Sequence, residues 1–348
     1  MNLTRTRLLN HRTARPIELT QLGFGSAPLG NLYHRVEEED AQATLQAAWD
    51  AGLRYFDTAP QYGLGLAEQR VGRAIARFGN TLTLSTKVGR LLKDCAPKDV
   101  TPEAFVDVPQ KRIVFDYTYD GVMRSYDDSI ARLGSDRIDI LLLHDIDAGT
   151  HGQEGEDRNL RELFSGGGYR ALNELREAGR IAAIGAGVNT WQICEKLLGE
   201  GAFDCFLLAG RYTLLEQDPL ETFLPLCTKR DVGIILGGPY NSGILATGPI
   251  EGARYNYAPA PPAILDRVAK IAAICADHAT PMIAAALQFP LAHPAVKTVI
   301  PGAANPRELR QNITIFETDI PVALWSDLRS AGLIRADAPL PKEPQDAA

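Results

Sequence analysis

Four polar side chains stand at or just after the ends of apolar stretches of this sequence. They are Asp57 in RYFDTAPQYG, Tyr62 five positions later, Lys87 in TLTLSTKVG and His144 in IDILLLHDID. A carboxylate, a phenol, an ammonium and an imidazole can together orient an alcohol or carbonyl oxygen and move its proton. None of the four can accept a hydride, so a redox reaction at this set requires a cofactor.

Tyrosine is the member of this set that needs help to act as a base, because its usual pKa is about 10. An ammonium within about 4–6 Å favours the phenolate, which makes Lys87 the candidate for lowering the pKa of Tyr62. A buried lysine needs a partner of its own, and Asp57 can supply it. His144 can donate a hydrogen bond to the substrate oxygen and orient it toward Tyr62.

The elements that carry these residues alternate between strands and helices along most of the chain. Apolar runs such as ILLL and FLLA are typical of strands covered on both faces, as in a parallel sheet. Eight βα units over roughly 300 residues predict an α/β fold, a (β/α)8 TIM barrel with its active site at the carboxyl ends of the strands. The predicted strands are 22–27, 54–57, 81–87, 138–144, 181–188, 203–209, 232–236 and 298–300, and the predicted helices are 37–51, 65–78, 121–133, 169–178, 191–198, 219–230, 262–278 and 306–316.

Two further segments, residues 90–117 and 145–168, follow neither pattern, and we predict that they are elaborated βα loops over the mouth of the barrel. No low-complexity linker divides the chain. We therefore expect one domain over residues 1–348, with the barrel at about 16–317 and a C-terminal helix and tail at 318–348.

An open dinucleotide-binding sheet is the rival architecture, and it requires G-x-G-x-x-G or G-x-G-x-x-A after a strand. Three G-x-G sequences lie in or after predicted strands, and they begin at Gly23, Gly63 and Gly185. Their third positions hold Pro28, Glu68 and Thr190. None of the three sequences therefore has the glycine or alanine that the dinucleotide-binding fingerprint requires, which favours the barrel.

The composition limits which binding partners and which cellular location we expect. The net charge is −7 without a Lys/Arg cluster, so we expect a small-molecule substrate and no nucleic acid. Neither an apolar leader nor a run of about 18 apolar residues is present, and we expect a cytoplasmic protein without a membrane partner, a monomer or a small homo-oligomer. The five cysteines are scattered without a C-x-x-C pair, and no metal-ligand spacing occurs, so we predict no disulfide framework and no metal site.

The chain resembles the aldo-keto reductase superfamily over about residues 16–317. FDTAPQYG, STKVG, DILLLHD and IPGAANPRELRQN match the family's motifs in order and spacing. The resemblance implies a (β/α)8 barrel that binds a nicotinamide dinucleotide, with Tyr62 as proton donor or acceptor, Asp57 and Lys87 tuning it, and His144 orienting the substrate oxygen. GFGSAPLGNLY, HDID and GVN look most like the aldose 1-dehydrogenase branch, which also resembles NAD-dependent pyridoxal 4-dehydrogenases.

The same resemblance implies residues that bind the cofactor and the substrate. The carboxamide-binding asparagine would be Asn189, and GGPYNSGIL would cover the pyrophosphate. Cofactor contacts are expected from Asn189, Tyr212, Pro239, Tyr240, Ser242, Gly243, Gly302, Ala303, Glu308 and Asn312. Substrate contacts are expected from Tyr33, Leu64 and Asp145, with His34, Trp191 and Tyr240 as further candidates for the pocket wall.

The segment after the last strand predicts NAD over NADP. Relatives that prefer NADPH carry basic residues where this chain has Gly302 and Glu308, although Arg307 and Arg310 flank the position and can compensate. A carboxylate repels a 2′-phosphate and can accept hydrogen bonds from a free ribose diol. The resemblance to the aldose 1-dehydrogenase branch implies oxidation of the hemiacetal carbon of an aldose, of the L-fucose or D-threo-aldose type, to a lactone. The alternatives are a pyridoxal 4-dehydrogenase that forms 4-pyridoxolactone, and a cofactor-binding regulatory subunit without turnover.

Overall fold

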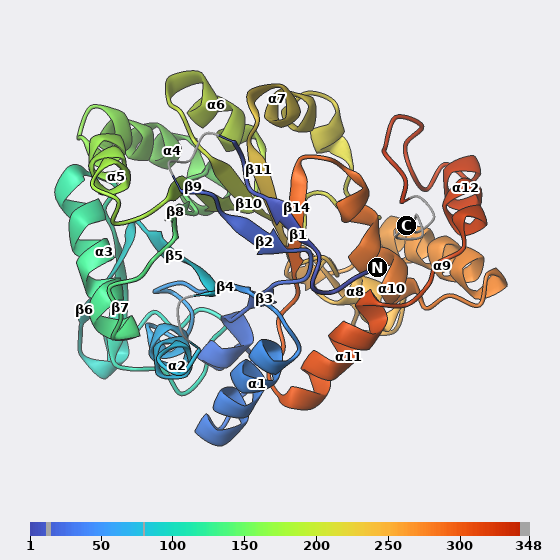
Figure 1. Ribbon diagram of the computed structural model, residues 1–348, viewed down its shortest axis with the longest axis horizontal. Helices are drawn as coiled ribbons and strands as arrows, with labels where there is room; N and C mark the ends of the chain where they lie inside the picture. The colour runs from blue at the N-terminus through green and yellow to red at the C-terminus, as the bar shows by residue number, and fades with distance from the viewer. Residues whose placement is uncertain (12–14, 79–80, 342–348) are drawn as a thin grey trace.

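Eight parallel strands form the centre of the molecule (Figure 1) in a computed structural model that describes residues 1–11, 15–78 and 81–341. They follow one another around a barrel in chain order, and its two edges meet through the parallel bridges Leu22 to Val299 and Gly25 to Gly302. The predicted (β/α)8 barrel is therefore confirmed, with all eight strands near their predicted positions. The strands are β3 (Phe24–Gly25), β4 (Tyr55–Asp57), β5 (Thr83–Val88), β8 (Ile140–His144), β9 (Ala183–Val188), β10 (Cys205–Ala209), β11 (Gly233–Gly237) and β14 (Val296–Ile300).

Helices surround the strands, and each of the eight predicted helical segments overlaps one of them (Figure 1). Their apolar faces pack on the outer faces of the strands, so both faces of the sheet are covered. The predicted segments correspond to α1 (Glu38–Asp50), α2 (Leu66–Ile75), α3 (Tyr119–Leu133), α5 (Gly168–Glu177), α6 (Gln192–Glu200), α7 (Phe223–Arg230), α9 (Pro262–Asp277) and α11 (Pro306–Phe316).

An antiparallel hairpin of β1 (Thr6–Leu8) and β2 (Glu18–Thr20) lies across the end of the barrel where the strands begin (Figure 1). Leu9, Ile17 and Leu19 join Tyr55 and Leu142 in the apolar cluster that fills the barrel's interior. Because the hairpin closes the amino ends of the strands, side chains that must meet a small molecule are left to the carboxyl ends.

The two segments that were predicted to be elaborated βα loops follow β5 and β8, and each of them contains regular structure. Residues 90–117 include an antiparallel hairpin of β6 (Arg90–Asp94) and β7 (Lys111–Phe115), and residues 145–168 include α4 (Ala148–Phe164). Three glycines lie within α4, and Gly152 breaks its helical geometry with φ 68°. Glycine has a low helix propensity, which explains why this helix was not predicted from the sequence.

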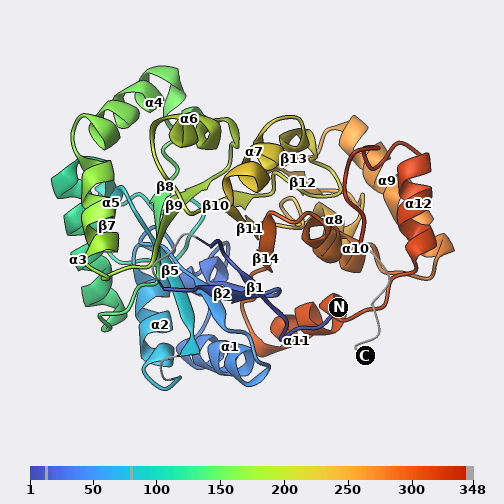
Figure 2. The same ribbon diagram turned by 45° about the horizontal axis from the view of Figure 1, so that its top comes forward.

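Other elements complete the chain outside the eight units. These are α8 (Ile244–Thr247), β12 (Arg254–Tyr255), β13 (Ala258–Pro259), α10 (Met282–Gln288) and, in the predicted C-terminal segment, α12 (Val322–Ser330). Figure 2 shows α9 and α12 side by side at one end of the molecule.

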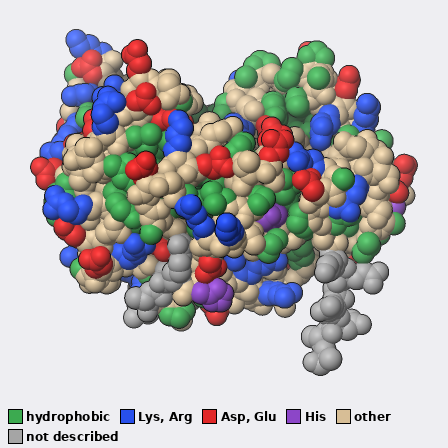
Figure 3. All heavy atoms as spheres, turned by 90° about the horizontal axis from the view of Figure 1, so that it is seen from above, with side chains coloured by type: hydrophobic (Ala, Val, Ile, Leu, Met, Phe, Trp, Pro, Cys, Tyr) green, Lys and Arg blue, Asp and Glu red, His purple; other side chains and the backbone are tan. Residues whose placement is uncertain are grey.

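Within the described residues no single helix is long and apolar enough to cross a membrane, although the bent pair Pro262–Asp277 and Met282–Ala292 passes by length and composition. On the face that Figure 3 shows, Lys and Arg side chains are interspersed with Asp and Glu side chains.

Candidate active site

Three of the four sequence-predicted catalytic residues lie at the carboxyl ends of neighbouring strands. Asp57 ends β4, Lys87 is the fifth of six residues in β5, and His144 ends β8. These strands are adjacent in the barrel in the order β4, β5, β8, so their ends meet at one rim. Tyr62 lies in the loop after β4, and its ring faces that of His144 edge-on at 6.1 Å between centroids. The structure thus brings all four together.

Lys87 is the centre of the group and only 1% exposed. Its Nζ donates to Asp57 Oδ2 at 2.8 Å, to the Thr58 carbonyl at 2.8 Å and to Tyr62 Oη at 3.1 Å. Ser85 Oγ donates to the other oxygen of Asp57 at 2.7 Å. All three ammonium protons are therefore used, and the ammonium is held against the phenol oxygen in a fixed position.

Burial and neighbouring charges have opposing effects on the pKa values of Lys87 and Tyr62. Burial lowers the pKa of Lys87, but the charge of Asp57 and the hydrogen bonds outweigh it, and the pKa ends above its usual value. Burial raises the pKa of Tyr62 to about 12, while Lys87 opposes this rise and Asp57 adds to it. The expected lowering by Lys87 is present but smaller than the effect of burial, so Tyr62 is a protonated phenol at neutral pH before any ligand binds.

His144 is held as a neutral imidazole. Burial, together with the positive charges of Arg90 and Lys87, keeps the pKa of His144 well below its usual value. Its Nε2 lies 3.5 Å from Asp145 Oδ2, and its buried Nδ1 has no hydrogen-bond partner among the described residues. A neutral ring has one N–H, which it can present to a substrate oxygen without competing for the proton of Tyr62.

The loop that carries Tyr62 packs unusually close to the loop after β3. A Cβ on Gly63, where φ is 64°, would lie 2.3 Å from the carbonyl oxygen of Gly30, and a Cβ on Gly30 would lie 2.5 Å from the carbonyl carbon of Tyr62. Only glycine at both positions allows this contact without a shift of the backbone. The contact therefore fixes where the Tyr62 ring enters the mouth.

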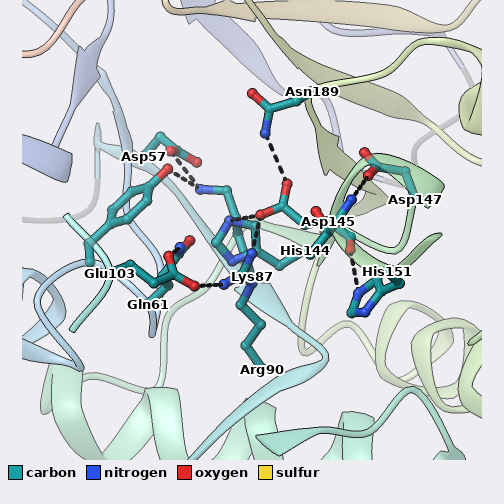
Figure 4. A network of polar contacts seen from close by, with 12 residues as sticks. Asp57, Gln61, Lys87, Arg90, Glu103, His144, Asp145, Asp147, His151 and Asn189 are labelled. Atoms are coloured by element: carbon teal, nitrogen blue, oxygen red, sulfur yellow. Dashed lines mark hydrogen bonds and ion pairs between the residues drawn. The ribbon is translucent and has the colours of Figure 1, made fainter. Parts of the chain in front are cut away.

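A second ion-pair network lies beside the catalytic four (Figure 4). Arg90, which follows β5, places its two terminal nitrogens on two carboxylates, Asp145 Oδ2 at 2.5 Å and Glu103 Oε1 at 3.0 Å. Gln61 also donates to Glu103. The guanidinium lies over the ring of Phe115, with its central carbon 5.1 Å from the centroid. This network ties the loops after β4, β5 and β8 together at the mouth.

The segments expected to hold the cofactor's phosphates and ribose are joined in the structure. Tyr240 Oη donates to Asn312 Oδ1 at 3.1 Å, and Asn312 Nδ2 donates to the Gly302 carbonyl at 3.1 Å. In the same loop Asn241, Ser242 and Gly243 follow one another with φ of 46°, 60° and 97°. The N–H groups of Asn241 and Gly243 donate to the carbonyls of Gly238 and Tyr240, at 3.1 and 3.0 Å, so the segment is a tight turn held by its own backbone. Pro239 precedes this turn.

Asn189 fits the expected carboxamide contact by position, because it directly follows β9 beside the mouth. Its Nδ2 donates to Asp145 Oδ1 at 3.3 Å, and Tyr257 Oη donates to its Oδ1 at 3.4 Å. A partly exposed amide that offers both N–H donors and an oxygen acceptor at the mouth can pair with a carboxamide. Ala303 is buried and can offer such a ligand only its backbone.

Tyr212 does not join this group, which corrects the prediction that it contacts the cofactor. Its side chain is fully buried and packs on the rings of Phe289 and His293, at 5.4 and 5.7 Å between centroids. The side chain that reaches toward Asn189 from this loop is the preceding Arg211, whose Nε donates to the Asn189 carbonyl at 2.6 Å. An aromatic ring gains more from core burial than a guanidinium does, so the two neighbours point in opposite directions.

Of the sequence-predicted substrate residues, two lie at the mouth and one is buried in the core. Tyr33 is 58% exposed on the rim and Asp145 lies within the ion-pair network, but Leu64 is only 1% exposed and cannot line a pocket. The Leu64 prediction is therefore corrected, since burial is the favoured state of an apolar side chain. Among the further candidates, His34 is exposed and Trp191 stacks on Phe223 in helix packing.

Several residues at the mouth escaped the reading of the sequence. Phe105 lies 6.2 Å from the Tyr62 ring between centroids, and Tyr257, 62% exposed at the tip of the β12–β13 hairpin, reaches Asn189. Both come from loops without a motif. Ser85 had a usable signal, because it stands two positions before Lys87 and so faces the same side of β5. Over the described ranges no group of three or more His, Cys, Asp or Glu side chains is placed to hold a metal ion.

Comparison with known proteins agrees with the geometry. A model of the aldo/keto reductase family matches residues 21–332. A pyridoxal 4-dehydrogenase from Microbacterium luteolum is 45% identical over 327 residues, and a D-threo-aldose 1-dehydrogenase from a Pseudomonas species is 38% identical over 324; each alignment covers 91% of this chain and 95% of the relative. The holo form of an aldo-keto reductase from Bacillus halodurans superimposes with a TM-score of 0.73 at 24% identity, covering 98% of this chain and 99% of that one. The chain therefore belongs to the aldo/keto reductase family and is an oxidoreductase that acts on a CH–OH group with a nicotinamide cofactor.

Proposed function

We propose that this enzyme uses NAD+ to oxidise the hemiacetal carbon of a cyclic aldose to a lactone, with Tyr62 as the general base. The observation that carries the proposal is the position of Lys87 Nζ, which is 2.8 Å from Asp57 Oδ2 and 3.1 Å from Tyr62 Oη. An ammonium fixed on a phenol oxygen stabilises the phenolate, which is the form of Tyr62 that can take the proton of the substrate hydroxyl.

The chain's residues divide the work as follows. Lys87 stabilises the phenolate form of Tyr62, and this phenolate takes the proton of the hemiacetal O–H and becomes the phenol. The N–H of neutral His144 donates to the same substrate oxygen and fixes its direction. A bound nicotinamide supplies the acceptor for the hydride of the hemiacetal C–H, and Asn189 would hold its carboxamide. The burial of Asp57, Lys87 and His144 keeps water away from the charges that develop.

A second substrate, pyridoxal in its cyclic hemiacetal form, is favoured by a separate observation. The relative that acts on pyridoxal by its name is 45% identical, against 38% for the aldose enzyme. Aromatic side chains suited to a pyridine ring also surround the mouth: Phe105 beside Tyr62, and the exposed Tyr33 and Tyr257. Both substrates lose a hydride from C–H and a proton from O–H at one carbon, so the catalytic roles are the same.

The test is a panel of substrates at saturating NAD+, read as NADH absorbance. L-fucose, L-galactose, D-arabinose and pyridoxal are compared by kcat/KM, with lactone identified in the product by mass spectrometry. We expect one substrate class to exceed the others by at least tenfold. A preference for pyridoxal selects the second candidate, and cofactor binding without NADH formation from any cyclic hemiacetal would leave only the regulatory subunit.

The preference for NAD rests on the N-terminal turn of α11. Glu308 accepts from the backbone N–H of Ala304 and from the side chain of Asn305, each at 2.8 Å, which fixes its carboxylate at the start of this helix. A fixed negative charge repels a 2′-phosphate, and its remaining lone pairs can accept from ribose hydroxyls. All five cysteines are free, which supports our further proposal that the enzyme works in the cytoplasm.

We expect kcat/KM to be higher with NAD+ than with NADP+ by at least tenfold, and Glu308→Gln to reduce this ratio by raising activity with NADP+. The physical reason is the loss of charge at unchanged size. Glu317→Gln, at the other end of the same helix, is the matched control and should leave the ratio unchanged. A wild-type preference for NADP+ would refute the assignment.

A further inference from the structure

The residue after His144 has an unusual backbone and three anchors. Asp145 has φ 45°, which is uncommon for a residue other than glycine. Tyr117 Oη donates to the carbonyl of His144 at 2.6 Å, and His151 Nε2 lies 2.9 Å from the carbonyl of Asp145. The backbone N–H of Asp145 donates to the Gly187 carbonyl of β9 at 2.9 Å. The surroundings therefore hold Asp145 in a conformation that it would not adopt by itself.

This conformation places the carboxylate between three functional side chains (Figure 4). Oδ2 accepts from Arg90 at 2.5 Å and lies 3.5 Å from Nε2 of His144, while Oδ1 accepts from Nδ2 of Asn189 at 3.3 Å. The Asp145 side chain is 9% exposed and that of Arg90 is 4% exposed, so solvent screens this contact weakly. One buried carboxylate thus reaches both the residue proposed to orient the substrate and the residue proposed to hold the nicotinamide.

The contacts determine what each neighbour presents to a ligand. A carboxylate 3.5 Å from Nε2 favours the His144 tautomer that carries its proton on this nitrogen, and the contact is not a hydrogen bond, so the N–H stays available to a substrate oxygen. At Asn189 the carboxylate takes the amide N–H, and Tyr257 Oη donates to the amide oxygen. The orientation of the amide is therefore fixed from both ends, and its oxygen remains an acceptor for a carboxamide N–H.

We propose that Asp145 is a positioning residue, which the Arg90 ion pair holds in place so that it sets His144 and Asn189 relative to each other. This inference rests on the proposed function, because it assigns the substrate to His144 and the carboxamide to Asn189. Asp145 touches neither ligand in this account. It links the orientation of the substrate oxygen to that of the nicotinamide through one rigid group.

The test is a double-mutant cycle on cofactor binding with Asp145→Asn, Asn189→Ala and the double variant. The asparagine keeps the size of Asp145, but Arg90 takes its single oxygen, so its NH2 faces the NH2 of Asn189 and misorients that amide. We measure the dissociation constant of NADH by its fluorescence. Each single variant should weaken binding by about tenfold, and the double variant by little more than either one, because the amide is already misplaced.

Two further cycles keep the result interpretable. Arg90→Lys keeps the charge but loses the fork, and it should also couple to Asn189→Ala. Asp147→Asn is the matched control, since this buried carboxylate caps α4 through the Thr150 N–H at 3.0 Å and no hydrogen bond joins it to His144 or Asn189. The changes that Asp147→Asn and Asn189→Ala cause in the dissociation constant of NADH should multiply in the double variant. Thermal unfolding of each variant verifies that it folds.

Losses that multiply to about a hundredfold in the Asp145→Asn and Asn189→Ala double variant would overturn the inference and leave the proposed function standing. A wild-type protein that binds neither NADH nor NADPH would overturn the proposed function, and the inference with it.

Discussion

Replacing Tyr62 with phenylalanine is expected to lower kcat for hemiacetal oxidation by about 10²- to 10⁴-fold, the usual contribution of a positioned general acid or base. The substitution removes only the Oη that accepts from Lys87 at 3.1 Å, while the ring keeps its packing beside Phe105. The dissociation constant of NADH should change by less than about threefold, because the oxygen acts in the transition state rather than in cofactor binding. NADH formation and NADH fluorescence measure the two quantities.

Tyr119→Phe is the matched control for this prediction. Its hydroxyl donates to Glu174 on the outside of the barrel, so its loss should leave kcat unchanged. A Tyr62→Phe enzyme that retains wild-type kcat would refute the general-base role. An enzyme in which kcat and cofactor binding fall together would instead show that the hydroxyl supports the site's structure.

The barrel could be predicted because its signals are local. Each strand is an apolar run, and each helix shows apolar residues at helical spacing. The four catalytic residues stand at or after the ends of these runs, where the parallel strands of a barrel end together. The hairpin of β6 and β7 was missed because its strands pair across a gap that no short pattern spans. The sequence therefore specifies the repeating units better than the loops that differ between them.

The ion-pair network at the mouth shows why the rest of the site could not be predicted. Arg90 is 13 residues from Glu103 and 55 from Asp145, and only the fold reveals that one guanidinium pairs with both carboxylates. Tyr212 and Leu64 were assigned to ligands because they stand near segments that resemble the family, yet both are buried. A motif gives the position of a residue along the chain, whereas the side chain's direction depends on the competition between core and solvent.

Replacing Lys87 with methionine is expected to move the pH dependence of oxidation upward and to destabilise the fold. Because burial raises the pKa of Tyr62 to about 12 and Lys87 opposes that rise, loss of the ammonium raises this pKa further. The phenolate then becomes scarcer at every pH below it, so oxidation falls and its rising limb moves to higher pH. Asp57 also loses its partner in a buried site, which costs about 3–5 kcal/mol of unfolding free energy.

The double variant Asp57→Asn with Lys87→Met separates these two effects. It removes both charges, so no buried charge is left unpaired, and much of the stability measured by chemical denaturation should return. Activity should not return, because the effect of Lys87 on the pKa of Tyr62 is larger than the opposing effect of Asp57. Rates of NADH formation between pH 7 and pH 10 provide the comparison. If the double variant oxidised substrate like the wild type at pH 8, Lys87 would be a structural partner of Asp57, and the ionisation of Tyr62 would need another source.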